Sequence, residues 1–268
     1  IIINLPRGMN IENHTLIFKL NSRLKFNMIR YMEEKEGIFM QYDTLLFDID
    51  NTLLDFEADE SQALKRLFDF VGIELTADLH QKYSAYNQSL WRKLERNEIT
   101  REELLATRFN VFFKENFNRD VTDLNLNDRY INYLSDGHDL MPHATELLQL
   151  LEQDPAIRLE VATNGVPQTQ YKRLKEAEIM NYFDQVFVSQ EIGVNKPNIE
   201  FYNYIEDHLE NFDARRTLMI GDSLTSDIQG GNNANIDTVW FNPQHLENSS
   251  SAQPTYEIDD LLQIKKLI

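Results

Sequence analysis

The chain has 268 residues, of which 42% are hydrophobic, enough to bury one substantial core or a core with a smaller second domain. Its formal net charge of -18 argues against nucleic-acid polymers as partners, because phosphate backbones are bound by clustered Lys and Arg. The absence of cysteine excludes a disulfide scaffold, a cysteine zinc site and a thiol nucleophile. No apolar run approaches the roughly 18 residues that cross a bilayer, and the first residues lack a secretory signal, so we expect a soluble cytoplasmic protein without a membrane partner.

Residues 1–39 differ in composition from the rest of the chain. They contain no Ala, Val, Asp or Gln but seven Ile and five Asn, and they carry a charge of +2 against -20 for residues 40–268. Two interpretations are open: a genuine basic N-terminal arm, or an extension upstream of a natural start at Met40. A strand pattern that begins almost directly after Met40 favours the second interpretation.

From Met40 onward, short apolar runs alternate with longer helical patterns. The runs are rich in Val, Ile, Leu and Phe, which is typical of buried parallel strands joined by crossover helices. They are Thr44–Ile49, Leu159–Ala162, Gln185–Val188, Thr217–Ile220 and Thr238–Phe241. The pattern predicts an α/β fold with a doubly wound parallel sheet.

Residues 58–141 show helical periodicity and little strand signal. Apolar residues there recur at the spacing of one helix face. The first group is Leu64, Leu67, Phe68 and Val71. Thr100 followed by Glu103 is typical of a capped helix start. We therefore expect a helical cap of residues 58–141 inserted into a core of residues 40–57 and 142–268.

Two acidic residues, Asp48 and Asp50, end the first predicted strand. Alternate residues of a strand face the same way, so the two carboxylates converge if the strand stays regular. Two close carboxylates repel each other, and a hard cation such as Mg²⁺ relieves that repulsion. The alternative is an Asx turn leaving the strand, which needs one aspartate but not both.

Three further polar segments follow at predicted strand ends, where open α/β sheets bind their ligands. Thr163 and Asn164 lead into a helix and offer a hydroxyl and backbone N–H groups to a phosphate. Lys196 directly precedes a proline, and Asp222 and Asp227 flank the start of another helix. Each segment alone has an ordinary explanation as a turn, an exposed lysine or a helix cap. Their joint occurrence in one order favours a single phosphate and metal site.

With these four segments, residues 40–268 resemble the haloacid dehalogenase (HAD) superfamily of hydrolases, in the subfamily (IA) whose helical cap follows the first strand. Further segments are similar to the noncanonical pyrimidine nucleotidases (the YjjG-like enzymes), which hydrolyse nucleoside 5′-monophosphates. These segments are 87–92, 100–103, 107–109, 163–174 and 237–243. The resemblance implies a HAD-like core and a Mg²⁺-dependent phosphatase acting on nucleoside 5′-monophosphates, with pyrimidine and noncanonical pyrimidine forms as substrates.

The resemblance also assigns a role to each residue of the four segments. Asp48 would be the nucleophile that accepts the phosphoryl group, and Asp50 the general acid and base. Mg²⁺ would bind the Asp48 carboxylate, the Asp50 backbone carbonyl and Asp222, with support from Asp227. The phosphate-binding residues would be Thr52, Thr163, Asn164 and Lys196.

The cap is expected to select the substrate. Trp91 and Tyr86 are candidates to stack on a base, and Asn87 or Arg108 to bind its polar edge. Aromatic residues at helical spacing usually pack inward, so Trp91 and Tyr86 have an alternative role as cap core. Arg108 has an alternative role as a solvated or ion-paired helix residue.

Other functions remain open at this point. A phosphatase or phosphomutase acting on sugar phosphates or other small phosphate esters would share every core residue. Ile199 stands where many such relatives have a second proline, which argues against the sugar-phosphate branches. A regulatory module that accepts phosphate on Asp48 is a candidate of another class, although such modules lack a helical cap. The sequence leaves the oligomeric state open.

Overall fold

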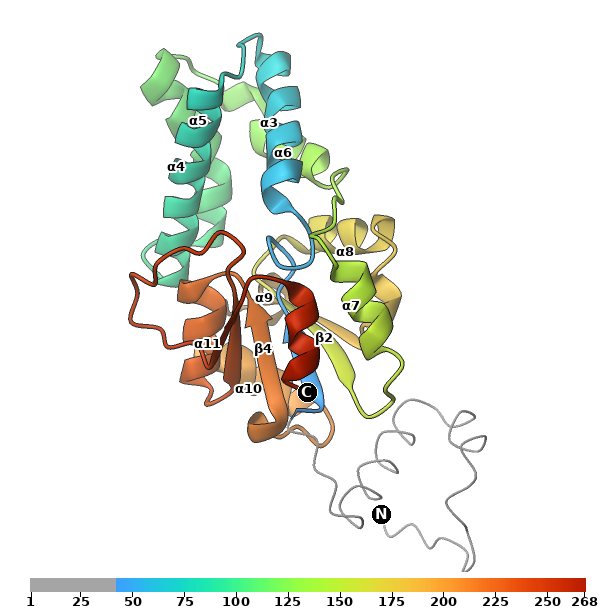
Figure 1. Cartoon of the computed structure of the whole chain (residues 1–268). Coiled ribbons are helices and arrows are strands. Elements are labelled where there is room, and N and C mark those ends of the chain that lie inside the picture. Colours follow the sequence, from blue (N-terminus) through green and yellow to red (C-terminus); the bar gives the residue numbers. More distant parts are fainter. Residues whose placement is uncertain (1–41) are drawn as a thin grey trace, which may run out of the picture.

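A computed structural model describes residues 42–268 (Figure 1). The expectations for residues 1–39 and for a start at Met40 lie outside the described residues. Six strands form one sheet in the order β3-β2-β1-β4-β5-β6, and every neighbouring pair is parallel. The strands are β1 (Thr44–Phe47), β2 (Arg158–Thr163), β3 (Gln185–Val188), β4 (Thr217–Gly221), β5 (Asp237–Phe241) and β6 (Tyr256–Ile258). The predicted α/β fold with a parallel sheet is confirmed.

Helices cover both faces of this sheet, as expected for strands that are buried on two sides. Leu45 and Phe47 of β1 pack on one face with α7 (Ala144–Leu151), α8 (Pro167–Glu176) and η5 (Leu261–Lys266), whereas Leu46 packs on the other face with α10 (Ile199–His208). The helices of the core are α7 (Ala144–Leu151), α8 (Pro167–Glu176), α9 (Ser189–Ile192), α10 (Ile199–His208) and α11 (Gln229–Asn233). Short 3₁₀ or π turns are η2 (Met180–Tyr182), η3 (Ala214–Arg216), η4 (Leu224–Ile228) and η5 (Leu261–Lys266).

Four helices between β1 and α7 form a separate unit, which we call the cap, above the carboxyl ends of the strands (Figure 1). They are α3 (Phe56–Val71), α4 (Ala77–Glu95), α5 (Arg101–Phe117) and α6 (Leu126–Leu134), with the turn η1 (Thr122–Leu124) before α6. The cap has its own aromatic core, in which Tyr83 stacks on Phe109 at 5.1 Å between ring centroids. The predicted capped start of α5 is confirmed: Glu103 N donates to Thr100 Oγ1, and Thr100 N donates to Glu103 Oε2.

Strand β1 lies between β2 and β4, so the chain leaves β1 on one side for β2 and later returns to the other side. This point of reversal opens a crevice at the carboxyl ends of the strands, which is where open α/β sheets bind ligands. The cap lies over this crevice. Among residues 42–268, no helix is long and apolar enough to cross a membrane.

Candidate active site

The polar segments singled out in the sequence meet at the carboxyl edge of the sheet. Asp48 follows β1, Thr163 ends β2 and Asp222 follows β4, and these three strands are direct neighbours. All three residues line a cavity of about 650 Å³ between the core and the cap. This volume lies within the range of small-molecule sites, roughly 300–1,000 Å³.

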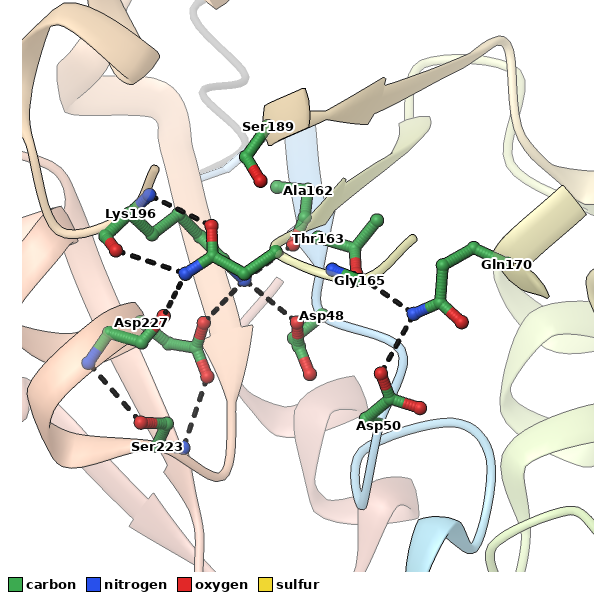
Figure 2. Close-up of polar contacts among 12 residues, drawn as sticks. Asp48, Asp50, Ala162, Thr163, Gly165, Gln170, Ser189, Lys196, Ser223 and Asp227 are labelled. Atoms are coloured by element: carbon green, nitrogen blue, oxygen red, sulfur yellow. Dashed lines mark hydrogen bonds and ion pairs between the residues drawn. The ribbon is translucent and has the colours of Figure 1, made fainter. Parts of the chain in front are cut away.

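Lys196 is the centre of the polar contacts at this edge (Figure 2). Its side chain is 1% exposed, and its ammonium nitrogen donates to Asp48 Oδ1 at 2.7 Å, to Asp227 Oδ1 at 2.6 Å and to the Ala162 carbonyl at 2.6 Å. The three donor hydrogens of the ammonium are therefore all used. Lys196 lies in the loop between α9 and α10, where the Asn164 side chain holds its backbone with hydrogen bonds to the N–H and the carbonyl.

The buried charges change the protonation of these groups. Burial, together with the charges of Asp227 and Asp50, raises the pKa of Asp48 to about 7 against the opposing effect of Lys196. Burial and the neighbouring carboxylates also raise the pKa of Asp222 well above its usual value. For Lys196, burial alone would lower the pKa, but the carboxylates of Asp227 and Asp48 outweigh it and raise the pKa. Lys196 is therefore a fixed positive charge, whereas burial and mutual repulsion make Asp48 and Asp222 hold their protons to a higher pH than free carboxyls.

Asp48, Asp222 and Asp227 each offer one carboxylate oxygen, and these three oxygens lie within 4.8 Å of one another. An all-oxygen donor set of this kind fits a hard divalent cation such as Mg²⁺, which would also relieve the mutual repulsion. Both oxygens of Asp227 are already engaged, by Lys196 and by the Ser223 N–H at 3.0 Å. Asp227 comes this close because residue 221 is glycine, where a Cβ would lie 2.2 Å from Asp227 Oδ2.

Asp50 lies beyond the regular part of the first strand, in the turn that follows it. Strand β1 ends at Phe47, and the chain turns so that Asn51 has a positive φ of 58°. The Asp50 carboxylate consequently faces α8, where Gln170 Nε2 donates to its Oδ2 at 2.8 Å and Arg173 binds its Oδ1 (Figure 2 shows the Gln170 contact). The condition of a regular strand is therefore not met, although both carboxylates line the same cavity and the charge of Asp50 raises the pKa of Asp48.

Of the four predicted phosphate-binding residues, two line the cavity, whereas Lys196 and Thr52 are not among its lining residues. Thr163 and Asn164 line the cavity. The Thr163 hydroxyl oxygen accepts hydrogen bonds from Gly165 N and Gln170 Nε2, both at 3.0 Å, so its own proton is left to donate to a ligand. Thr52 is fully buried and does not line the cavity, because the turn at Asn51 directs its side chain into the protein. The structure does not place Thr52 where a phosphate contact requires it.

Three of the four predicted cap residues line the cavity: Asn87, Trp91 and Arg108. Asn87 is held between Glu60, which accepts from its Nδ2 at 3.1 Å, and Arg108, which donates to its Oδ1 at 3.4 Å. Tyr86 does not line the cavity and packs on Phe112 instead, at 5.8 Å between ring centroids. The cavity-facing stripe of α4 follows the spacing of residues 84, 87, 88, 91 and 95, and position 86 lies off it.

Two cap residues that the sequence did not single out touch the core beside the site. Arg101, at the start of α5, donates to the Asn164 carbonyl at 2.9 Å, to Ser189 Oγ at 2.8 Å and to Asn195 Oδ1 at 2.5 Å. Glu95, at the end of α4, accepts from Thr225 Oγ1 at 2.8 Å, and burial raises the pKa of Glu95 to about 7. These contacts attach the end of α4 and the start of α5 to the core.

The parallel sheet, the inserted helical cap and the cluster of carboxylates around a buried lysine define an enzyme of α/β fold with a capped active site, and comparison with known proteins agrees. The family profile of haloacid dehalogenase-like hydrolases matches residues 42–235. The chain is 44% identical over 220 residues to pyrimidine 5′-nucleotidase PynA of Streptococcus pneumoniae, covering 82% of this chain and 92% of PynA. It is 33% identical over 229 residues to pyrimidine 5′-nucleotidase YjjG of Escherichia coli, covering 85% and 99%.

A solved relative has the same fold. The HAD-hydrolase YfnB of Bacillus subtilis is 41% identical to this chain, and its crystal structure superposes with a TM-score of 0.79 over 85% of this chain and 99% of YfnB. That structure was determined bound to magnesium and shows interdomain movement. The chain belongs to the haloacid dehalogenase-like hydrolases.

The expected family, fold and enzyme class are therefore confirmed. The chain is a hydrolase, and its relatives PynA and YjjG are by name phosphoric monoester hydrolases. The sequence reasoning missed Gln170 and Arg173 as partners of Asp50. The sequence feature that could have identified them is their spacing of three residues on α8, which places both on one helix face. This helix begins shortly after Thr163 at the end of β2.

Proposed function

We propose that this hydrolase is a phosphatase that cleaves nucleoside 5′-monophosphates, with pyrimidine nucleotides as its preferred substrates. The observation that carries the proposal is the pairing of Lys196 with Asp48 beside the carboxylates of Asp222 and Asp227. This arrangement places a carboxylate nucleophile beside the fixed positive charge of Lys196 and next to a site suited to a metal cation. The names of PynA and YjjG support the nucleotide substrate.

Asp48 and Asp222 would hold Mg²⁺ directly, with the backbone carbonyl of Asp50 as a further ligand. Asp227 would support the metal site without binding the ion directly, because its oxygens already accept from Lys196 and from the Ser223 N–H. The bound ion would neutralise the charge of the phosphoryl group and of the aspartates around it. The magnesium in the YfnB structure supports this choice of metal.

The reaction would proceed in two displacements. Lys196 holds Asp48 Oδ1, which orients the other oxygen to attack phosphorus. A bond forms between phosphorus and Asp48 while the bond to the ribose 5′-oxygen breaks, and Asp50 gives its proton to that oxygen. Water then attacks the phospho-aspartate, Asp50 takes a proton from the water, and inorganic phosphate leaves with Asp48 regenerated. The Thr163 hydroxyl would donate to a phosphoryl oxygen, and the positive charge of Lys196, which is bonded to Asp48, would stabilise the phosphoryl charge in both steps.

The cap end of the cavity supports a nucleoside as the leaving group. The cap residues Trp91, Asn87 and Arg108 all line the cavity, and the polar groups of Asn87 and Arg108 are fixed by hydrogen bonds. Glu60, an acceptor, lies beside them and binds Ser84, Asn87 and Tyr130. A heterocyclic base has both a face to stack and an edge of donors and acceptors, whereas a small sugar phosphate has no face to stack.

A phosphate-release screen with Mg²⁺ tests the proposal. We expect UMP, dUMP and dTMP to be hydrolysed with far higher kcat/KM than ribose 5-phosphate or glyceraldehyde 3-phosphate, and we expect no release by the Asp48→Asn variant. Faster turnover of the sugar phosphates would contradict the nucleotide substrate but leave the phosphatase chemistry intact. Slow loss of phosphate from Asp48 with no turnover of any ester would indicate a phospho-accepting regulatory module instead.

A further inference from the structure

Arg173 of α8 joins the acid/base candidate Asp50 to the cap. Its side chain is fully buried, and its guanidinium makes contacts in three directions. Nη1 binds Asp50 Oδ1 and also donates to Gln170 Oε1 at 3.1 Å. Nη2 donates to Asp59 Oδ2 at 2.8 Å, and Nε donates to the Gly137 carbonyl at 3.1 Å. A buried guanidinium is costly unless it is paired and hydrogen-bonded, so this contact set is a defined arrangement.

The two cap-side partners of Arg173 mark the two places where the chain crosses between the core and the cap. Asp59 lies in the first turn of α3, on the outgoing segment, and Gly137 follows α6, on the returning segment. The two segments are themselves bonded: Asp55 N donates to the Asp139 carbonyl at 2.8 Å, and Leu54 bridges Leu140. We call residues 52–59 and 136–141 the linkers.

The two linkers pack tightly against each other beside Arg173. Gly137 lies so close to Asp59 that a Cβ on residue 137 would be 2.5 Å from the Asp59 carboxylate. Asp59 also accepts from the Asp139 N–H at 3.3 Å, and its side chain is fully buried. A shift of either linker therefore moves the groups that hold the Arg173 guanidinium.

If Arg173 only fastened the two linkers to α8, its contacts with Asp59 and the Gly137 carbonyl would be sufficient. Arg173 instead also binds Asp50, whose side chain is 29% exposed and lines the substrate cavity. With Gln170 on its other oxygen, Asp50 has both oxygens engaged on the α8 side. To give a proton to a leaving group, Asp50 must change at least one of these bonds, and Arg173 is the partner that the linkers can move.

We propose that Arg173 is a positioning residue that couples the setting of the Asp50 carboxylate to the position of the cap linkers. Movement of the cap shifts Asp59 and Gly137, the guanidinium follows, and Asp50 is placed for or withdrawn from proton transfer. This inference rests on the proposed phosphatase function, in which Asp50 is the acid and base.

The choice of leaving group provides the test. The alkoxide of a nucleotide needs a proton to depart, whereas p-nitrophenolate departs without one, and kcat/KM reports the chemistry up to formation of the phospho-enzyme. We expect Arg173→Met to lower kcat/KM for UMP by about 100-fold and for p-nitrophenyl phosphate by less than about fivefold. Asp50→Asn should give the same pattern, and the double variant should lose little more than either single variant.

Lys172→Met is the matched control. Lys172 is the neighbour of Arg173 on α8 and pairs with Asp136 of the same linker at 2.5 Å. Within residues 42–268 its ammonium contacts only groups other than Asp50. A residue that only fastens the linker should affect both esters equally, and we expect that result for Lys172→Met. Equal losses on the two esters for Arg173→Met, or additive losses in the double variant, would overturn the proposal.

A second readout needs no turnover. If Arg173 couples Asp50 to the linkers, Asp50→Asn should speed backbone hydrogen exchange of residues 136–141, and it should have no further effect when Arg173 is already Met. Unchanged exchange in Asp50→Asn would overturn the coupling even in an active enzyme. Failure of the proposed function would show separately, as a wild-type protein that releases phosphate from neither ester while the exchange effect persists.

Discussion

The ammonium nitrogen of Lys196 lies 2.7 Å from Asp48 Oδ1, although the two residues are 148 positions apart in the chain. The fold brings them together by placing β1 between β2 and β4 and by holding the Lys196 backbone with Asn164, directly after β2. This pair joins the nucleophile to the charge that stabilises its product.

Removing the lysine tests this pair. We expect Lys196→Met to abolish measurable phosphate release and to destabilise the fold by about 3–5 kcal/mol, because Asp48 and Asp227 then remain buried without their cation. Thermal unfolding and a phosphate-release assay measure the two effects. Lys175→Met, an exposed lysine on α8, is the control and should change neither. A folded and active Lys196→Met variant would refute the role of the ammonium.

The stability of the metal-free protein should depend on pH. The pKa of Asp48 is 3.8 in its unperturbed state and about 7 in the fold, so between these values the folded state keeps a proton that the unfolded state has released. Folding stability must therefore fall as the pH rises from about 4 to about 7. We expect the metal-free Tm to drop by roughly 5–10 °C across this window, with Mg²⁺ reversing the loss by stabilising the ionised carboxylates.

Asp48→Asn isolates this contribution. Glu160, whose pKa burial raises to about 8, adds to the same decline in both proteins. The variant should show a shallower fall in Tm with pH and a higher metal-free Tm at pH 7.5 than the wild type, measured by scanning calorimetry in EDTA. Identical profiles of Tm against pH for the two proteins would show that ionisation of Asp48 does not cause the loss of stability.

Arg101 should control how well the cap stays on the core. Its three hydrogen bonds are lost in Arg101→Met, and bonds of this kind contribute about 1–3 kcal/mol when one partner is charged. We expect kcat/KM for UMP to fall about tenfold or more, mainly through a higher KM. Glu102→Gln changes the exposed neighbour and should have no such effect. Unchanged KM in Arg101→Met would mean that these contacts do not form in the working enzyme.

Arg108 should contribute to selection of the base. It is 3% exposed, lines the cap end of the cavity and is oriented by Asn127, which accepts from its Nε and Nη2. We expect Arg108→Met to lower kcat/KM for UMP about tenfold, while kcat/KM for ribose 5-phosphate changes little. A steady-state comparison of the two substrates measures this selectivity, and parallel losses on both would assign Arg108 to cap packing instead.

The sequence predicted the sheet and the order of the site segments well, because buried parallel strands have a continuous apolar pattern and each is followed by a polar residue. Strand β6 was missed, since Tyr256–Ile258 has only three residues and no apolar run. Asp48, Lys196 and Asp222 could be singled out because each follows a strand or a turn that is visible locally.

The remaining details depend on tertiary geometry. The turn at Asn51 places the Asp50 carboxylate against α8 and buries Thr52, and no local pattern shows where such a turn directs the chain. The helical spacing of Tyr86 fits either a cap-core residue or a residue that contacts the ligand. Its packing on Phe112 assigns it to the cap core. Arg101 and Arg173 read as ordinary helix residues, because their partners lie on distant segments.

The most direct test of the mechanism is to find the phosphoryl group on the enzyme. Wild-type protein mixed with Mg²⁺ and UMP, quenched in acid and digested, should yield one peptide that carries a single phosphoryl group, located by mass spectrometry on Asp48. The label should be absent in Asp48→Asn. Rapid hydrolysis of UMP with no phosphorylated Asp48, or with the phosphoryl group on another residue, would contradict the account.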